Sequence, residues 1–301
     1  MFKQHTLITL LSLGALVGAS TWAHAAPKPP TPFTLNLDGS PTEWRTHAEE
    51  RPQPPLAKDP RFQSRTPPAG AEVLFDGKNL DAWVPAKKRK APGQLWEIKN
   101  GVMVATGNDL LTKQSYGDAQ LHIEWRIPKE RKDHVGQGST NSGVMFGDGR
   151  YEVQVLDVHP DTNKTYPDGM AGGIYAQFPP KFNAALPKGE WQSYDITFTA
   201  PRFDSNGNTT KRARFHVVWN NIVVQEDQEL VGDCSWRGSK LFPTEKLRSE
   251  AKLRHKHPLL QAHPERLPLR LQFHGDPVEF RNIWIVDLEK GNEAKGVERK
   301  K

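Results

Sequence analysis

Three segments of the chain alternate apolar residues with large polar or ionisable ones: Leu121–Arg126, Arg150–Val155 and Leu269–His274. Successive side chains of a β-strand point to opposite faces, so each segment predicts a strand with one apolar and one polar face. A solvated sheet face fits this alternation equally well, although such faces favour Thr, Ser and Lys. Acids, bases and amides are more typical of a groove for a polar ligand. If the strands are neighbours, their shared polar face comprises His122, Glu124, Arg126, Arg150, Glu152, Gln154, Arg270, Gln272 and His274.

Short β-type runs recur from Ala71 onward and are separated by turn-forming pairs such as Asp76-Gly77 and Asn206-Gly207. Only Pro243 to His257 has a helical composition, and it resembles a surface insertion. About twelve strands with little helix predict an all-β fold, a two-sheet antiparallel jelly-roll sandwich. The predicted strands lie around residues 72–75, 95–98, 101–105, 119–127, 143–147, 150–157, 172–177, 191–199, 212–219, 222–225, 268–274 and 278–287.

The two ends of the chain differ from this pattern. Residues 1–25 have the features of a secretory signal: Lys3, a mostly apolar run over 7–19, and the small-x-small site Ala23-His24-Ala25. That run is too short to span a bilayer, and no later segment is long and apolar enough to insert into one. We therefore expect cleavage near Ala25 and a periplasmic or secreted protein. Residues 26–70 form an extended, proline-rich lead-in, 71–289 the β-sandwich domain, and 290–301 a charged tail.

Charge and cysteine content narrow the function further. The formal net charge is +6, but the basic residues are scattered or lie in loops and the tail, so nucleic-acid binding is not expected. The single cysteine, Cys234, cannot form an internal disulfide, and we interpret it as a buried small apolar residue and not a nucleophile. The nine tryptophans suit both a core and stacking on sugar rings.

No phosphate-binding loop, GxSxG elbow, HExxH helix or cysteine-based zinc pattern is present. The candidates are therefore the groups of the polar face. Glu124 and Glu152 could act in catalysis, or each could pair with Arg126, Arg150 or Arg270. Asp157 ends its strand at a loop, where a sandwich commonly builds a site rim. His274 lies at a strand-to-turn junction, where it could be an acid, a base, a metal ligand or a hydrogen-bonded structural residue.

Other candidates are weaker. Glu152 and His274 could contribute to a divalent-metal site, but no spacing demands one, so no cofactor is certain. Asn141 could form a turn or bind a sugar hydroxyl. Tyr175 and Trp191 could stack on a sugar, whereas Trp125 and Trp284 alternate with the apolar residues and are expected in the core.

The order of several segments along the chain resembles the 3-keto-disaccharide hydrolase family, over roughly residues 38–288. Each segment is weakly specific, but their combined order is highly specific. Relatives often carry an acid where this chain has Phe273, and we interpret Phe273 as facing the apolar side. The matching segments are Leu74–Trp83, Gln120–Trp125, Asn141–Val144, Tyr151–Asp157, Thr165–Gly169, Gly173–Tyr175, Gly189–Asp195, Leu269–Gln272, His274-Gly275 and Phe280–Ile283.

The resemblance implies a concanavalin-like lectin/glucanase sandwich that cleaves glycosides already oxidised to a ketone at C3. A C3 ketone acidifies the C2 proton, so a base can remove it, the C1 substituent leaves by β-elimination, and water adds. From residue chemistry, Glu152 or Glu124 would be the base, His274 the acid or a metal ligand, and Arg126 or Arg281 would lie near the enolate oxygen. Substrate binding is assigned to His122, Arg126, Asn141, Gln154, Asp157, Tyr175, Gln272 and Arg281.

Two alternatives remain open. A non-catalytic carbohydrate-binding module would use the same face, lined by aromatic rings and amides, simply to hold sugars. An ordinary glycoside hydrolase would place two carboxylates, such as Glu124 and Glu152, across the scissile bond. In every case the expected partner is a carbohydrate.

Overall fold

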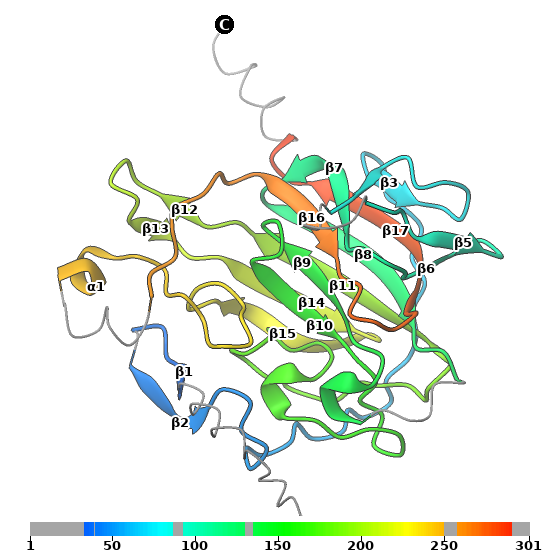
Figure 1. Ribbon diagram of the computed structural model, residues 1–301, viewed down its shortest axis with the longest axis horizontal. Helices are drawn as coiled ribbons and strands as arrows, with labels where there is room; N and C mark the ends of the chain where they lie inside the picture. Colours follow the sequence, from blue (N-terminus) through cyan, green and yellow to red (C-terminus); the bar gives the residue numbers. More distant parts are fainter. Residues whose placement is uncertain (1–32, 39, 87–92, 130–134, 250–257, 291–301) are drawn as a thin grey trace, which may run out of the picture. The chain divides into compact units, whose positions relative to one another are not determined.

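The computed structural model describes residues 33–38, 40–86, 93–129, 135–249 and 258–290. This part of the chain consists mainly of antiparallel strands, with one short α-helix and two 3-10 turns (Figure 1). The fold is therefore the predicted all-β sandwich. The signal segment 1–25 and most of the charged tail 290–301 lie outside the described residues.

One layer of the sandwich is a five-stranded antiparallel sheet. Its order is β10 (Tyr151–Val155), β9 (Ser142–Phe146), β16 (Leu267–Leu271), β7 (Leu110–Tyr116) and β4 (Trp83–Pro85). All five residues of β10 are buried, so other parts of the chain cover its polar face as well as its apolar face. The alternative interpretation of the polar residues as a solvent-exposed sheet face is therefore wrong for this strand.

The other layer is an eight-stranded antiparallel sheet. Its path runs β15 (Ile222–Glu229), β14 (Arg214–Trp219), β11 (Trp191–Thr199), β8 (Ala119–Arg126), β17 (Glu279–Asp287), β6 (Val102–Val104) and β5 (Glu97–Lys99), and β3 (Glu72–Phe75) pairs with β17. Two small two-stranded sheets join β1 (Phe33–Leu35) to β2 (Pro41–Arg45) and β12 (Arg202–Phe203) to β13 (Thr209–Lys211).

The core lies between the two large sheets. Phe146 of β9 stacks on Phe198 of β11 with ring centroids 4.5 Å apart, and Tyr151 of β10 packs against Phe198 at 5.7 Å. Each of these rings is at most 1% exposed, and full burial of such a side chain stabilises a fold by about 1.5–3 kcal/mol. Trp125 lies in this core, as expected, and Phe273 packs against it.

The alternation of apolar and polar residues in β8, β10 and β16 is confirmed, but the three strands do not lie side by side in one sheet. β10 and β16 belong to the five-stranded sheet, whereas β8 belongs to the eight-stranded one. The apolar residues of both sheets face the shared core, so their polar residues point in opposite directions. The prediction that all three strands share one polar face is therefore wrong, because alternation determines the facing of each strand and not its partners.

The strand pattern is otherwise close to the prediction, with clear exceptions. β3 and β11 have the predicted bounds, but β7 was not predicted because its stretch Thr112 to Ser115 is polar. Residues 172–177 form turns, with only isolated bridges at Ile174. The short helix α1 (Glu245–Ser249) lies within the stretch predicted to be helical, whose residues 250–257 lie outside the description.

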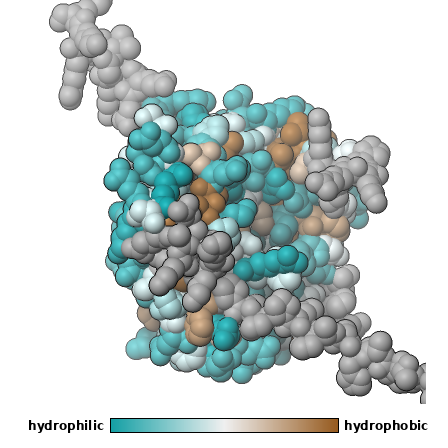
Figure 2. Space-filling view, turned by 60° about the vertical axis from the view of Figure 1, so that its left-hand side comes forward, coloured by the Kyte–Doolittle hydropathy of each residue, from teal (hydrophilic) through white to brown (hydrophobic). Residues whose placement is uncertain are grey.

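After β1 and β2, the lead-in has no further paired strand up to residue 70 and runs along the sandwich. Backbone bonds join Ala57 N–H to Asn183 O and Arg61 N–H to Asn220 O, both at 2.9 Å. The face in Figure 2 is mainly hydrophilic, with small hydrophobic patches. Within the described residues, no helix is long and apolar enough to cross a membrane.

Candidate functional site

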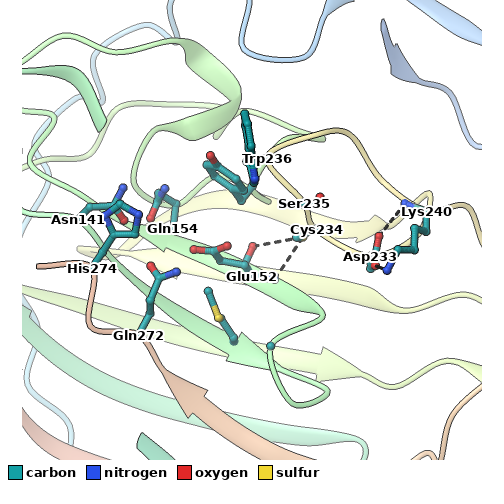
Figure 3. Close-up of a pocket in the computed structure, with 13 residues that line it drawn as sticks. Asn141, Glu152, Gln154, Asp233, Cys234, Ser235, Trp236, Lys240, Gln272 and His274 are labelled. Atoms are coloured by element: carbon teal, nitrogen blue, oxygen red, sulfur yellow. Dashed lines mark hydrogen bonds and ion pairs between the residues drawn. The ribbon is translucent and has the colours of Figure 1, made fainter. Parts of the chain in front are cut away.

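A pocket of about 620 Å³ lies on the face of the five-stranded sheet that points away from the core. Side chains of β9 and β10, the turn after β16 and the loop over residues 233–240 form its walls (Figure 3). Its volume is typical of a site for a small organic ligand. The lining residues are Asn141, Met145, Gly149, Glu152, Gln154, Tyr175, Asp233, Cys234, Ser235, Trp236, Lys240, Gln272 and His274.

The centre of the pocket is the Glu152 carboxyl group. Pairing across the sheet places Glu152 opposite Met145, and Met145 opposite Arg270. The Arg270 guanidinium is shared between Asp109 at 3.2 Å and Asp148 at 2.6 Å. Arg270, the nearest cation among these paired residues, is therefore already engaged by two acids, and Met145 separates it from Glu152.

Glu152 is only 7% exposed, and no hydrogen bond within the described residues reaches its carboxyl oxygens. Burial, with a smaller effect of the negative charge on Asp109, raises the pKa of Glu152 to about 8. Removal from water disfavours the charged form, and nothing beside this carboxylate compensates for it. A carboxyl group with such a pKa can accept a proton from a carbon acid near neutral pH and afterwards return it.

This pKa predicts the pH dependence of any reaction in which Glu152 acts as the base. The ionised form increases as pH rises through about 8, so with a leaving group that departs without a proton, log kcat/KM should rise with pH and level off above that value. The measurement is kcat/KM for a turned-over 4-nitrophenyl glycoside between pH 5.5 and 9.5. A profile already level at pH 6 would contradict this assignment.

A glutamine outside the pocket orients two of the pocket amides. Gln137 Oε1 accepts hydrogen bonds from Asn141 Nδ2 at 3.0 Å and Gln154 Nε2 at 3.1 Å. Gln137 itself donates to Thr165 Oγ1 and to Gly169 O. The amide nitrogens of Asn141 and Gln154 are thus held in place by the protein.

Gln272 differs from these amides. Its Oε1 is buried without a hydrogen-bond partner, and among the described residues no hydrogen bond reaches its side chain. In Figure 3 it lies beside Glu152, with His274 and Asn141 on one side and Asp233 and Lys240 on the other. A buried amide oxygen without a protein partner costs free energy unless a ligand or water donates to it, so Gln272 Oε1 is suited to accept a hydrogen bond from a substrate hydroxyl group.

The loop over residues 233–240 forms the remaining wall. Glu152 N–H donates to Cys234 Sγ at 3.3 Å, and burial raises the pKa of the Cys234 thiol, so the thiol stays protonated. Cys234 is therefore unsuited to be a nucleophile, as the sequence indicated. Lys240 Nζ lies 3.5 Å from Asp233 Oδ2, and Trp236 is 56% exposed.

Glu124 occupies a different environment, on the outer face of the eight-stranded sheet. Its oxygens accept hydrogen bonds from Ser64 Oγ at 2.5 Å, Asn282 Nδ2 at 2.8 Å and Arg281 Nε at 2.6 Å. His122 Nε2 lies 3.5 Å away. Burial acts to raise the pKa of Glu124, but the bonds from these partners outweigh it and lower that pKa to about 2. Such a carboxylate is a weak base, and its bonds hold the lead-in against the sheet.

The other predicted site residues outside the pocket have structural partners. His122 Nδ1 bonds Asp195 at 2.8 Å, Arg126 Nε bonds Glu279 at 2.6 Å, and Asp157 accepts from Thr162 Oγ1 at 2.8 Å. The guanidinium groups of Arg126 and Arg281 lie 4.6 Å and 4.0 Å from the Trp191 ring. Trp284 is buried beneath the lead-in, with Nε1 donating to Arg65 O, and not in the core between the sheets.

The predicted site is therefore divided between two faces of the molecule. The pocket brings together Glu152, His274, Asn141, Gln154, Tyr175 and Gln272. The opposite sheet or separate loops hold Glu124, His122, Arg126, Asp157 and Arg281. We therefore withdraw these five residues from the candidate site.

A structural role for Glu124 predicts a loss of stability on its replacement. Glu124→Ala leaves the partly exposed Arg281 without its carboxylate and should lower the free energy of unfolding by about 2–4 kcal/mol at pH 7. The folded pKa lies below the unfolded one, so the contribution is present above about pH 4.5 and declines as pH falls toward 2. Denaturant unfolding at pH 7 and pH 4 measures both effects. Equal stability of variant and wild type at pH 7 would exclude this role.

The pocket does not supply a complete metal-ligand set. Within the described residues, no three His, Cys, Asp or Glu side chains are grouped so that they could hold a metal ion. Glu152 and His274 provide two donors of the types that divalent metals accept, but no third joins them. We therefore derive no reaction step through a metal.

Sequence reasoning missed the loop over residues 233–240 and the orienting role of Gln137. The tryptophan-glycine context Ser235-Trp236-Arg237-Gly238 is a detectable signal, because an exposed aromatic next to a turn-forming glycine is suited to stacking on a sugar. Gln137 has no such signal, since its role depends on three segments that meet only in the fold.

Comparison with known proteins identifies the family of the chain. The family model described as "3-keto-alpha-glucoside-1,2-lyase-like domain" matches residues 70–286, so all of the lead-in except residue 70 lies outside it. A crystal structure of a candidate glycosyl hydrolase from Parabacteroides distasonis is similar, with 33% identity over 83% of this chain and 99% of that one and a TM-score of 0.63. A second such protein from the same organism has 23% identity over 73% and 94% of the two chains and a TM-score of 0.47. No match was found among curated proteins.

Proposed function

The chain belongs to the family of 3-keto-alpha-glucoside-1,2-lyase-like domains, and we propose that it cleaves glycosides already oxidised to a ketone at C3 of the sugar. A carbohydrate-processing role follows from the family. The finer statement, the oxidised substrate and the elimination mechanism, is our proposal. The observation that carries it is the buried, unpaired Glu152 carboxyl group with its pKa of about 8.

This carboxyl group suits proton removal from carbon better than ordinary glycoside hydrolysis. The ketone makes the C2 proton acidic enough for a modest base, so one well-placed carboxylate is sufficient. Ordinary hydrolysis needs two carboxyl groups across the scissile bond. Glu124, the expected second carboxylate, belongs to the other sheet, and the pocket's other acid, Asp233, pairs with Lys240.

The reaction would proceed in three balanced steps. The Glu152 carboxylate takes the C2 proton, and the electron pair of the C–H bond forms the C2–C3 enolate. The C1–O bond then breaks as the C1–C2 double bond forms, and the departing oxygen takes a proton from His274. Water finally adds as hydroxyl to C1 and gives its other proton to His274, while Glu152, after its proton has exchanged with water, returns a proton to C2, for net hydrolysis.

The developing enolate oxygen needs a hydrogen-bond donor. Arg126 and Arg281, expected in this role, bond Glu279 and Glu124 outside the pocket. Gln272 takes their place in the proposal, because it lines the pocket, its Nε2 can donate, and among the described residues no hydrogen bond engages that nitrogen. A neutral donor in a buried site still stabilises developing negative charge, since it is already oriented before the reaction.

Export is part of the proposal. The first 25 residues carry the charged start, the short apolar run and the small-residue site of a secretory signal. A periplasmic or secreted enzyme would meet oxidised glycosides outside the cytoplasm. Fractionation of the native host should recover the chain outside the cytoplasm and with its mature end near Ala26.

A non-catalytic sugar-binding module is the second candidate. The exposed Trp236 ring and the pocket amides favour sugar binding, and binding alone would require no more. A buried carboxyl group with a raised pKa destabilises the folded protein, however, and binding alone gives no reason for it.

The test uses two chromogenic substrates, 4-nitrophenyl 3-keto-α-glucoside and 4-nitrophenyl α-glucoside. The proposal expects release of nitrophenol from the keto substrate and none from the unoxidised one. Release from the unoxidised substrate alone would refute it. Binding of both sugars by calorimetry, with turnover of neither, would favour the sugar-binding module.

A further inference from the structure

A residue of the lead-in, His47, reaches the wall of the pocket from outside the matched family domain. It follows β2 in a tight turn and has a φ of 65°, in the left-handed region that few residues other than glycine adopt. The backbone N–H of His47 donates to Asp168 Oδ2 at 3.0 Å, and Asp168 is fully buried. Its side chain is only 12% exposed. The buried carboxylate thus holds the turn in a conformation that points the imidazole inward.

The imidazole of His47 contacts two aromatic residues that line the pocket. It packs against the Tyr175 ring and hydrogen-bonds the backbone of Trp236. Its ring packs against Tyr166 at 4.2 Å and Tyr175 at 5.3 Å between centroids. The hydroxyl groups of these tyrosines are 3.1 Å apart. Nε2 lies 2.9 Å from the Trp236 carbonyl oxygen, which can only accept, so Nε2 donates this bond.

The bond to Trp236 is important because the tip of its loop has little other support. The base of the loop is fixed by Asp233 N–H donating to Lys240 O and by Gln177 Nε2 donating to Gly232 O. In the described part of the chain, His47 makes the only hydrogen bond that reaches residues 235–239 from outside the loop. Without it, only bonds within the loop would hold the tip.

We propose that His47 is a positioning residue that holds the Trp236 loop, and with it a stacking wall of Trp236 and Tyr175 for a sugar ring. The substrate class is taken from the proposed function, but the positioning role does not depend on turnover. Trp236 is 56% exposed and Tyr175 lines the same pocket, so both present aromatic surface to a ligand. Sugar rings carry apolar C–H faces that pack on such rings while their hydroxyl groups bind the amides.

A segment that precedes the matched residues therefore contributes to the pocket wall. Residue 47 lies before residue 70, where the family match begins. The wall that His47 supports lies within the match, at residues 175 and 236. The lead-in thus determines how tightly this chain binds its sugar, and Glu152 determines the chemistry.

The test is a double-mutant cycle on His47 and Trp236, with KM and kcat measured on 4-nitrophenyl 3-keto-α-glucoside. His47→Ala and Trp236→Ala should each raise KM by about three- to tenfold, as expected for a lost aromatic contact, and change kcat much less. If His47 acts through Trp236, the double variant should be no worse than Trp236→Ala. Additive effects in the double variant would overturn the proposal.

Two further variants separate positioning from general stability. Gln53 also ties the lead-in to the sandwich, because its Nε2 donates to Thr165 O at 2.9 Å, but it does not line the pocket. Gln53→Ala should leave KM unchanged, and an equal rise in KM would overturn the proposal. His47→Gln retains a side-chain N–H donor and should recover part of the loss. No recovery by this variant would count against the hydrogen bond to Trp236.

Binding of methyl α-glucoside, measured by calorimetry on the same variants, separates this proposal from the proposed function. That sugar has no ketone and requires no turnover. If the double-mutant cycle is non-additive in binding but the wild type does not cleave the keto substrate, only the proposed cleavage of 3-keto-glycosides is refuted. Turnover by the wild type with an additive cycle would refute the positioning role alone.

Discussion

Glu152→Gln should lower kcat/KM for 3-keto-glucosides by about 10²–10⁴-fold, which is the usual contribution of a general base. Glutamine keeps the shape of the side chain but cannot accept the C2 proton. The measurement is nitrophenol release from 4-nitrophenyl 3-keto-α-glucoside at pH 8. Glu97→Gln is the matched control, because Glu97 is an exposed residue of β5 in the other sheet. A decrease of less than threefold for Glu152→Gln would remove this residue from the reaction.

The same substitution should stabilise the folded protein, which separates lost chemistry from lost structure. The pKa of Glu152 is raised from about 4.5 in the unfolded chain to about 8 in the folded one. The folded state therefore binds the proton more tightly, and stability declines as pH rises from about 4.5 to 8. Glu152→Gln avoids this loss and should exceed the wild type by roughly 3–5 kcal/mol at pH 8, with little difference near pH 4.

Gly143→Ala should lower kcat/KM by about 10²-fold without replacing a group that reacts, because displacing the base by about 1 Å can have this effect. A Cβ at position 143 would lie 2.4 Å from Glu152 Oε1 and 3.0 Å from its carboxyl carbon. The φ of Gly143 is not in the left-handed region, so alanine fits the backbone and the clash falls on the carboxyl group. The Glu152 side chain must therefore move away from its present position.

Gly117→Ala provides a control with the same kind of clash. A Cβ there would lie 2.4 Å from Oε2 of Glu289, also a carboxylate, and Glu289 pairs with Arg202 and Arg266 away from the pocket. Gly117→Ala should therefore match Gly143→Ala in stability but retain activity. The combination of Gly143→Ala with Glu152→Gln should be no less active than Glu152→Gln alone. Full activity of Gly143→Ala would show that the carboxyl position is not critical.

The sequence predicted the architecture well because strand alternation is a local property. Each of β8, β10 and β16 shows its facing in its own residues, and the core formed by their apolar positions confirms it. β7 was missed because its polar stretch, with Lys113 and Gln114 exposed, lacks the alternation of a half-buried strand, although β7 pairs with β16 and β4. Strand pairing of that kind is set by tertiary structure and is not visible in the segment.

The site was predicted in part for the same reason. Glu152, Gln154, Gln272 and His274 were found because neighbouring strands of one sheet place them together. Glu124 and Glu152 have equivalent local patterns, yet hydrogen bonds to the lead-in lower the pKa of one while burial raises that of the other. Only contacts between distant segments, such as Ser64 with Glu124 or His47 with Trp236, distinguish the two faces.

The central claim is that Glu152 removes the proton at C2 of a 3-keto-sugar. It is tested most directly by nuclear magnetic resonance of the sugar product formed in D₂O. Cleavage by elimination and hydration predicts that the sugar product formed by the wild type carries deuterium at C2, and that Glu152→Gln neither releases aglycone nor introduces deuterium above the uncatalysed rate. A product released by the wild type with its original C2 hydrogen intact would contradict the account.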